Sequence, residues 1–322
     1  MFDALDDVWP RVVGRAALAP SIHNTQPWAW QRTDGGAVLY ADWSRQVPEA
    51  DPQGHGLLLS CGAALEATGL ALSALRIGAT ITAIPGRRTC DLQPVARIET
   101  GPGAEDPLQR QLEARATWRG AFEARQPRLF GWSRDDTLLV TDAARPARLA
   151  ELNDAAGLRL LRRRGVRREL LGWMRLRDGH PRRGIDGMDR AALGLGRGAA
   201  LGLRLTWGPA FRMLDLVGAM RPRLAEAALT ATAPVIAAFH RPAGEDPVES
   251  GRAYLRMWLE ATSLGFAGWP MAALTDDPAA RAEVIELLKI GPDRDLVQVI
   301  RFGQPTGTLA PRARRPEAEV LK

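Results

Sequence analysis

The spacing of apolar residues predicts an alternation of short strands and helices. Apolar side chains recur at helical intervals over residues 3–18, and this pattern ends at Pro20. Further along, apolar and β-branched residues gather in short runs between turn signals, the first two runs around Asp34-Gly35-Gly36. The expected strands are Trp28–Arg32, Ala37–Ala41, Thr80–Ile84, Val95–Ile98, Thr137–Thr141, Pro234–His240 and Leu296–Phe302.

Two of the expected helices are apolar on nearly every side. The first starts at Asp51-Pro52, with proline in the first turn, and runs to about Arg76. The second spans about Val248–Leu264. Helices of this composition belong inside a domain. More amphipathic helices are expected at Leu108–Ala116, Ala147–Leu161 and Ala210–Ala227.

A faint internal repeat links the two apolar helices. Leu65-Glu66-Ala67-Thr68 recurs as Leu259-Glu260-Ala261-Thr262. So short a match can arise by chance, but both halves share the order strand, buried helix, strand. The polar stretch Glu99–Pro107 is the best candidate boundary. We therefore expect an α+β fold of two related units, residues 1–104 and 105–322, with the Arg- and Gly-rich segment 163–215 inserted in the second.

Composition and charge remove several classes of function. The chain has 322 residues, 46% of them hydrophobic, which suffices for a core. Its net charge of +6 invites a nucleic-acid partner, but the densest basic stretch, Leu160–Arg168, has no aromatic residue for base stacking. The two cysteines and four histidines lack disulfide or metal-ligand spacing. With no leader or spanning segment recognisable, we expect a cytoplasmic protein with no nucleic-acid, membrane or metal partner.

The most distinctive stretch is Ala19–Trp30, A-P-S-I-H-N-T-Q-P-W-A-W. It concentrates hydroxyl, amide and imidazole groups in a loop between two prolines, and such loops suit a polar planar ligand or a phosphate. A plain helix-to-strand connection, with Ser and Asn satisfying local backbone groups, explains it equally well.

Two arginine motifs follow. In Arg115-Ala116-Thr117-Trp118-Arg119 the two guanidinium groups can converge on one anion, although a solvated helix end is the simpler explanation. In Pro311-Arg312-Ala313-Arg314-Arg315-Pro316 alternate arginines on an extended segment point the same way. A disordered basic tail is the simpler explanation there, and the last dozen residues carry the chain's one signal of disorder.

Together the three motifs resemble the nitroreductase-like flavoprotein family. Residues 19–28 match that family's A-P-S-x-x-N-x-Q-P-W signature at every fixed position. Arg115-x-Thr117-x-Arg119 is similar to its Arg-x-Ser/Thr-x-Arg/Lys flavin-phosphate motif, and Arg312-x-Arg314 to its C-terminal Lys/Arg-x-Arg pair. The loop here precedes the phosphate motif, the reverse of the usual order. That order resembles the single-chain Acg-type branch of mycobacterial dormancy-associated proteins.

The resemblance implies a nitroreductase-like fold in which two fused units form a pseudo-dimer. Ordinary members are homodimers, with the signature loop from one subunit and the phosphate arginines from the other. This chain has one signature loop and one set of phosphate arginines, so a single FMN site and a monomer are expected; further dimerisation is left open.

Carried over by position, the family's FMN contacts fall on three groups of residues. Arg115, Thr117, Arg312 and Arg314 correspond to the phosphate and ribityl contacts, and Arg119 to the cation beside N1 and O2 of the ring. The first unit contributes Pro20, Ser21, Ile22 and Asn24. Trp269-Pro270-Met271-Ala272-Ala273 resembles the strand whose amides face N5 and O4, although Ala272-Ala273 replaces a frequent Glu-Gly.

The expected function is FMN-dependent oxidoreduction between small-molecule donor and acceptor, with no catalytic side chain because the flavin carries the chemistry. The alternative is a flavin-binding or flavin-sequestering protein with little turnover, covered by the insertion as a lid. Trp173, Met174, Trp207, Phe211 and Met213 in and beside that insertion suit a core or a pocket. Ser21 with His23 lacks the carboxylate and elbow motif of a hydrolase.

Overall fold

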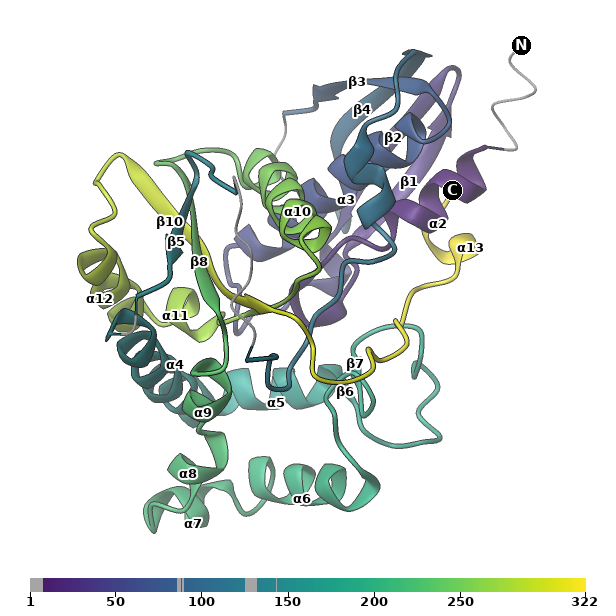
Figure 1. The fold of residues 1–322 in the computed structure, drawn as a ribbon. Coiled ribbons are helices and arrows are strands. Elements are labelled where there is room, and N and C mark those ends of the chain that lie inside the picture. The colour runs from purple at the N-terminus through teal and green to yellow at the C-terminus, as the bar shows by residue number, and fades with distance from the viewer. Residues whose placement is uncertain (1–7, 86–87, 89, 125–131, 143) are drawn as a thin grey trace.

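The protein was analysed as a computed structural model, which describes residues 8–85, 88, 90–124, 132–142 and 144–322. It contains two four-stranded antiparallel sheets with helices between and around them (Figure 1), which confirms the predicted α+β class. The first sheet has the order β1-β2-β4-β3 and the second β5-β8-β10-β9. The strands are β1 (Trp28–Thr33), β2 (Gly36–Asp42), β3 (Ile77–Ala83), β4 (Leu92–Pro102), β5 (Thr137–Val140), β8 (Val235–Pro242), β9 (Ala267–Pro270) and β10 (Arg294–Gly303).

The two sheets share one connection as well as one order. In each, a long helix joins the second strand to the third along the chain: α3 (His55–Ser73) in the first and α10 (Pro247–Ser263) in the second. The repeated Leu-Glu-Ala-Thr sequence lies in these two helices. This is the topology that a duplicated unit requires, while the fusion itself and the division at residues 104 and 105 stay predictions.

Helices α3 and α10 pack against each other in the centre of the molecule (Figure 1). Glycines make the contact possible. A Cβ atom on Gly62 would lie 2.0 Å from the Val248 carbonyl oxygen, and one on Gly251 would lie 2.0 Å from that of Leu59. Of the described helices, α3 is the one long and apolar enough to cross a bilayer, but 78% of that window is buried inside the protein. It is a core helix.

The helix contact gives a first testable prediction. Gly62→Ala should destabilise the fold by about 1–3 kcal/mol, because the new methyl group meets fixed backbone of α10. Gly69→Ala on the same helix is the matched control, since the nearest atom to its Cβ is 4.0 Å away. That variant should gain a few tenths of a kcal/mol, up to about 1, from helix propensity. Urea unfolding of both variants measures the difference, and equal losses in the two would refute the close approach.

Two predicted helices are wrong. At Leu108–Ala116 the chain forms only the short 3₁₀ helix η3 (Pro107–Gln111). It then becomes extended because Trp118 donates to the Gly268 carbonyl at 3.0 Å and Gly268 donates to the Ala116 carbonyl at 3.2 Å, so that pairing with β9 overrides local helix propensity. The helix expected at 210–227 is broken into α7 (Phe211–Leu216), α8 (Met220–Leu224) and α9 (Ala227–Thr230), with Gly218 at a φ of 71° between the first two.

The remaining helices frame the second sheet. The helix expected at residues 3–18 is present as α2 (Trp9–Ala16), and residues 3–7 of that prediction lie outside the described residues. Helix α4 (Ala144–Arg162) matches the prediction at 147–161 to within a turn, and α11 (Ala273–Asp276) follows β9. Sequence reasoning missed α12 (Pro278–Leu288), although Asp277 caps it by accepting from the Ala280 amide at 2.9 Å and proline follows the cap.

The C-terminal segment is ordered, so the prediction of a disordered tail is wrong. Its last residue pairs with the first sheet: the Lys322 amide donates to the Trp30 carbonyl at 2.7 Å, and the Arg32 amide donates to the Lys322 carbonyl at 3.2 Å. Helix α13 (Glu317–Val320) buries Val320 completely in the apolar core that contains the first sheet and α3. The tail therefore runs from the second sheet to β1, and Figure 1 shows the C-terminus beside α2.

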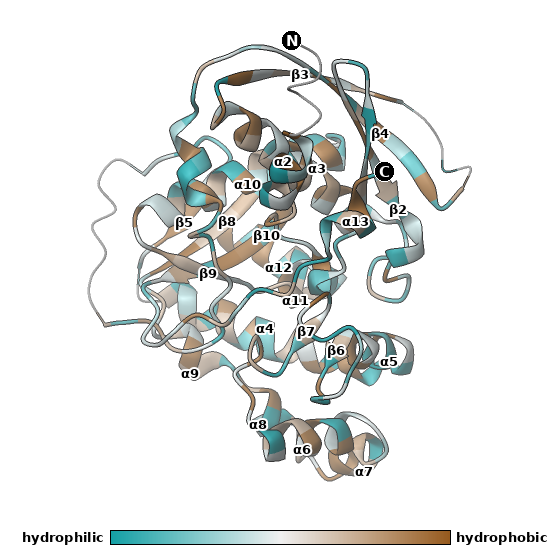
Figure 2. Cartoon of the chain, turned by 90° about the vertical axis from the view of Figure 1, so that its right-hand side faces the viewer, coloured by the Kyte–Doolittle hydropathy of each residue, from teal (hydrophilic) through white to brown (hydrophobic). Residues whose placement is uncertain are grey.

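The insertion forms a helical lobe beneath the sheets (Figures 1 and 2). It contains α5 (Arg164–Trp173), the short strands β6 (Met174–Arg175) and β7 (Met188–Asp189), and α6 (Arg197–Trp207), and it ends within α7. Two small apolar clusters lie within the lobe and against α4. The outer faces of α6 and α7 leave Leu201, Leu205, Met213 and Leu216 exposed.

Candidate functional site

All the predicted site residues line one cavity. Its volume is about 1980 Å³, and its wall is built from the loop after α2, the segment before β5, the β9–α11 connection, the C-terminal segment and the insertion. Four predicted segments that are separated in sequence therefore border one cavity. The predicted residues on its wall are Pro20, Ser21, Ile22, Asn24, Arg115, Thr117, Arg119, Pro270, Met271, Ala272, Ala273, Arg312 and Arg314.

The loop enters the cavity with a strained backbone. His23, Asn24 and Gln26 have φ values of 46°, 56° and 52°, in the left-handed region that non-glycine residues avoid. The Ser21 hydroxyl accepts from the Gln26 amide at 3.0 Å and so closes the loop on itself. Several strained residues in one short loop mark a functional segment more than a plain connection, which favours the ligand-loop interpretation of this sequence.

Asn24 and Gln26 join three parts of the chain at this loop. The Asn24 side-chain amide donates to the Gly187 carbonyl of the insertion at 3.0 Å and to the Ala313 carbonyl of the tail at 3.1 Å. The side-chain amide nitrogen of Gln26 donates to the Ile185 carbonyl at 2.8 Å, and its side-chain oxygen accepts from the Arg315 backbone amide at 2.8 Å. Sequence reasoning left Gln26 off the site, although it is a fixed position of the signature.

Arg115, Arg312 and Arg314 of the two basic motifs lie close together, and none of them forms an ion pair with a carboxylate of the described residues. Arg115 is 3% exposed; its Nη2 donates to the Leu18 carbonyl at 2.8 Å, and its buried Nη1 has no partner among the described residues. Arg314 donates to the same carbonyl at 3.0 Å and to the Asn24 amide oxygen at 3.1 Å, while its buried Nε has no described partner. Arg312 donates to the backbone carbonyls of Leu112 and Glu113, and the charge of Glu113 partly opposes the lowering of its pKa by burial.

Holding these positive charges together costs free energy of folding unless an anion binds between them. Burial, and then the charges of Arg314 and Arg312, hold the pKa of Arg115 well below its ordinary value. Burial and the neighbouring Arg312 lower the pKa of Arg314 to about 9. Converging buried guanidinium groups with donors to spare fit the oxygens of a phosphate, which they bind as forks. The donor set therefore fits a phosphorylated ligand.

Arg119 connects the cavity to the insertion. It donates to the Ala192 carbonyl at 2.7 Å and to the Met188 sulfur at 3.6 Å, and burial lowers its pKa despite the nearby charges of Glu226 and Asp189. Behind it lies a cation that the sequence analysis did not identify. Arg301 of β10 is fully buried, stacks 4.1 Å from the centre of the Trp269 ring, and has a pKa lowered to about 10 by burial. No motif marks Arg301, which pairs with Trp269 only through the sheet register.

Not every backbone amide of the β9–α11 connection is free to bind a ligand. The Met271 amide is already used, since it donates to the Val299 carbonyl at 2.7 Å, and the Met271 side chain is 3% exposed. Ala272 and Ala273 follow it at the start of α11 and remain the better positions for an amide facing a ligand.

Other candidates are weaker. Burial lowers the pKa of His23 to about 4, and the described residues contain no group of His, Cys, Asp and Glu that could hold a metal. Of the aromatic and methionine set, Met174 and Trp207 line the cavity, whereas Phe211 is core and Met213 is 64% exposed.

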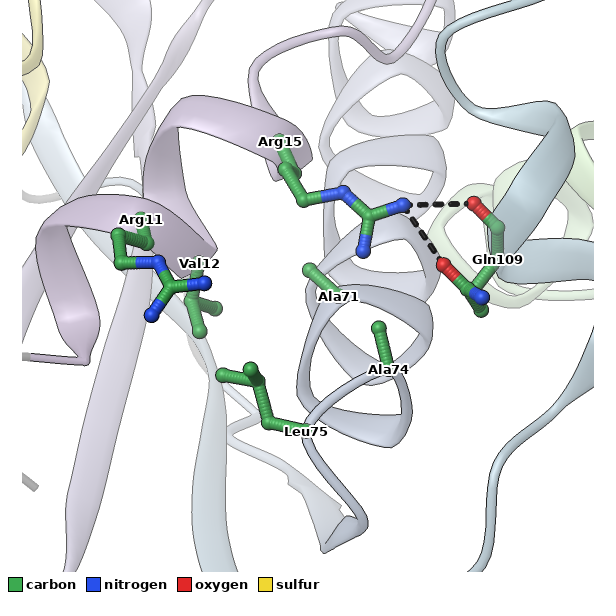
Figure 3. Close-up of a pocket in the computed structure, with 7 residues that line it drawn as sticks. All are labelled: Arg11, Val12, Arg15, Ala71, Ala74, Leu75 and Gln109. Atoms are coloured by element: carbon green, nitrogen blue, oxygen red, sulfur yellow. Dashed lines mark hydrogen bonds between the residues drawn. The ribbon is translucent and has the colours of Figure 1, made fainter.

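A separate cavity of about 280 Å³ lies between α2, α3 and η3 (Figure 3). Its Arg15 is already bound by the Gln109 carbonyl and side-chain oxygens at 2.9 and 2.7 Å.

Sequence comparison identifies relatives named as putative NAD(P)H nitroreductases. No protein-family model matches the chain. It is 34% identical over 113 residues to "Putative NAD(P)H nitroreductase Rv3131" of Mycobacterium tuberculosis, covering 34% of this chain and 33% of the relative. It is 37% identical over 79 residues to "Putative NAD(P)H nitroreductase acg" of the same species, 24% of each chain. The chain is homologous to Acg-type nitroreductase-like proteins.

The homology is local, since the match spans about a third of the length of the Rv3131 relative and a quarter of that of Acg. Among solved structures, the FMN-dependent nitroreductase NfnB from Mycobacterium smegmatis in complex with NADPH overlaps 62% of this chain and 87% of its own, at 19% identity and a TM-score of 0.34. NfnB from a sphigopyxis strain overlaps 62% and 89%, at 17% identity and a TM-score of 0.36. The sequence matches to the Rv3131 and Acg relatives confirm the Acg-type resemblance that the motifs predicted.

Proposed function

We propose that the chain is an FMN-dependent oxidoreductase of the nitroreductase-like kind. The observation that carries this proposal is the convergence of Arg115, Arg312 and Arg314 on one cavity. None of the three forms an ion pair with a carboxylate of the described residues, and Arg115 and Arg314 each keep a buried nitrogen without a described hydrogen-bond partner. A phosphate needs such a cluster, and a structural ion-pair network would contain acids. The homology to proteins named NAD(P)H nitroreductases supports the same assignment and suggests NADH or NADPH as electron donor.

In this proposal the chain's residues bind and orient FMN, which supplies the hydride and electron transfer when bound. Arg115, Arg312 and Arg314 hold the phosphate, with Thr117 beside them. The loop residues Pro20, Ser21, Ile22 and Asn24 lie against the cofactor from the first unit. Arg119 places a positive charge at the ring, where it stabilises negative charge that develops on reduction.

Purified protein tests the cofactor directly. We expect a yellow preparation with flavin absorbance, or its recovery when FMN is added to colourless protein. FMN should bind more tightly than riboflavin, because riboflavin lacks the phosphate that the arginines require. If neither preparation acquires flavin absorbance, or if the two ligands bind equally, the proposal fails.

A flavin-sequestering role is the second candidate, and the insertion is the observation that favours it. Its residues line the same cavity, and Asn24, Gln26 and Arg119 each bond to its backbone. A closed insertion would exclude substrate along with water. Anaerobic mixing with NADH or NADPH separates the roles: rapid bleaching followed by reoxidation with a quinone supports an enzyme, and persistent oxidised flavin supports a binder. A cytoplasmic location and a monomeric state remain predictions.

A further inference from the structure

The most exposed apolar side chains of the protein gather on one part of the helical lobe. Among the described residues, the five most exposed large apolar side chains all lie between positions 201 and 217: Leu201 (58% exposed), Leu205 (51%), Met213 (64%), Leu216 (88%) and Val217 (70%). Exposed leucines scattered singly over a surface need no explanation, whereas a cluster of exposed apolar side chains marks an interaction site.

The cluster has helical geometry and points away from the core of the lobe. Leu201 and Leu205 are one turn apart on α6, and Met213 and Leu216 are one turn apart on α7, so each pair shares a helix face. The buried sides of the same helices carry Ala200 and Phe211, which pack into the apolar clusters of the lobe. In Figures 1 and 2, α6, α7 and α8 project at the end of the molecule farthest from the first sheet.

Arginines lie among these apolar side chains. Arg204 of α6, Arg212 of α7 and Arg221 of α8 form no ion pair with a carboxylate of the described residues. Between residues 190 and 225 the chain has one acidic residue, Asp215, and Arg162 of α4 already binds it at 3.0 Å. We call these three arginines, together with the five exposed apolar residues, the end face of the lobe. The end face is both apolar and positively charged.

The charge of the end face decides which partner it fits. A second copy of the chain, meeting the first through the same face about a twofold axis, would bring the arginines together without an acid between them. Protein partners also anchor their central side chains in pockets, and no residue of the end face lines either of the two cavities described above. A projecting surface of apolar side chains and arginines is what peripheral membrane contact requires.

We propose that the end face binds the surface of an anionic membrane. Its apolar side chains enter the boundary between lipid headgroups and acyl chains, and its arginines bind lipid phosphates while their aliphatic stems cover apolar surface. This departs from the expectation of no membrane partner, which rested on the lack of a recognisable spanning segment; peripheral contact requires none. The inference is independent of the proposed function, because the end face takes no part in the FMN site.

Co-sedimentation of the full chain with phospholipid vesicles tests the proposal. Vesicles of equal parts phosphatidylglycerol and phosphatidylcholine should bind the protein at least roughly tenfold more tightly than vesicles of phosphatidylcholine alone, because arginines are attracted to an anionic surface. Added salt should weaken this binding by screening the charges. A protein that stays in solution with the anionic vesicles, or that binds both kinds of vesicle equally, would overturn the proposal.

Two double variants locate the contact. Leu201→Gln combined with Leu216→Gln should weaken binding to the anionic vesicles at least roughly tenfold, because two apolar side chains no longer enter the bilayer boundary. Arg212→Gln combined with Arg221→Gln should weaken it by a similar factor at low salt. All four side chains are exposed, so the fold should be kept, and thermal unfolding checks that it is. Wild-type affinity in both double variants would overturn the assignment.

The matched control is Leu92→Gln combined with Arg97→Gln. Both residues are exposed on β4 in the first sheet, at the other end of the molecule (Figure 1), so vesicle binding should not change. A loss in this control equal to that in the end-face variants would refute a localised contact.

Sedimentation velocity without lipid tests the second copy as partner. The wild type and the Leu201→Gln, Leu216→Gln variant should have the same oligomeric state. A wild-type dimer that this variant converts to a monomer would assign the end face to self-association and overturn the membrane proposal.

Discussion

Arg115→Met should raise the dissociation constant for FMN by about two orders of magnitude. The substitution keeps most of the side-chain volume and removes the charge. Arg115 is buried, its Nη1 has no partner in the described part of the chain, and it shares the Leu18 carbonyl with Arg314. A charge-assisted hydrogen bond to phosphate contributes about 1.5–3 kcal/mol, and the rigid fork can form more than one. Titration of ligand-free protein, followed by flavin fluorescence, gives the constant.

The control for this prediction is Arg110→Ala, within η3. That side chain is 69% exposed and pairs with Glu105 at the surface, so FMN affinity should not change. Without ligand, the melting temperature of Arg115→Met should fall no further than the loss of one hydrogen bond to a backbone carbonyl explains. The substitution also removes a buried charge that Arg312 and Arg314 repel. An Arg115→Met protein that binds FMN within about threefold of wild type would exclude Arg115 from the phosphate site.

The cluster of Arg115, Arg312 and Arg314 shows which parts of the candidate site can be predicted from the sequence. Taken alone, the loop, Arg115–Arg119 and Arg312–Arg314 did not predict a common site; only the resemblance to the nitroreductase-like family did, and the three segments line one cavity. The sequence could not predict that the tail is ordered, because its order depends on Val320 packing into a core whose residues lie mostly hundreds of positions away in sequence. Local composition there gives only an Arg-rich run between prolines.

Residues that belong to no motif could not be predicted, for a similar reason. Glu226 lines the cavity through the packing of α9 on α4, and Arg301 lies behind the cavity wall through its sheet register with Trp269; neither arrangement leaves a local sequence pattern. Seven strands of the two large sheets and the two central helices were predictable from the apolar pattern, which reports burial directly, whereas β9 was expected only from the family resemblance. The broken helix at 210–227 and η3 were not, since a strand edge and a left-handed glycine override propensity there.

The arrangement explains why the loop and the arginines lie so far apart in sequence. The signature loop precedes the first sheet, Arg115–Arg119 precede the second, and α3 and α10 hold the two sheets together at their glycine contact. The insertion then reaches back to the first unit through Asp186. This carboxylate is 2% exposed and accepts from Arg45 at 2.6 Å, Arg175 at 2.7 Å and Arg182 at 2.9 Å.

Asp186→Asn should therefore destabilise the protein by about 3–5 kcal/mol, the usual loss when one partner of a buried ion-pair network is removed. The three arginines would be left without their shared charge, beside the Gln26–Ile185 hydrogen bond that connects loop and insertion. The control is Asp178→Asn, because Asp178 also binds three arginines, Arg183, Arg190 and Arg197, but its side chain is 40% exposed. That change should cost about 1 kcal/mol or less.

The pH dependence of the same variant identifies the cause. Burial alone would raise the pKa of Asp186, but hydrogen bonds from Arg45, Arg175 and Arg182 hold it below its ordinary value. A carboxyl whose folded pKa is lowered contributes stability above its unfolded pKa and loses it as pH falls through the folded one. The gap in unfolding free energy between wild type and Asp186→Asn should accordingly be largest above about pH 5 and shrink in more acidic solution. A gap that stays constant down to acid pH would mean that Asp186 acts through packing and not through its charge.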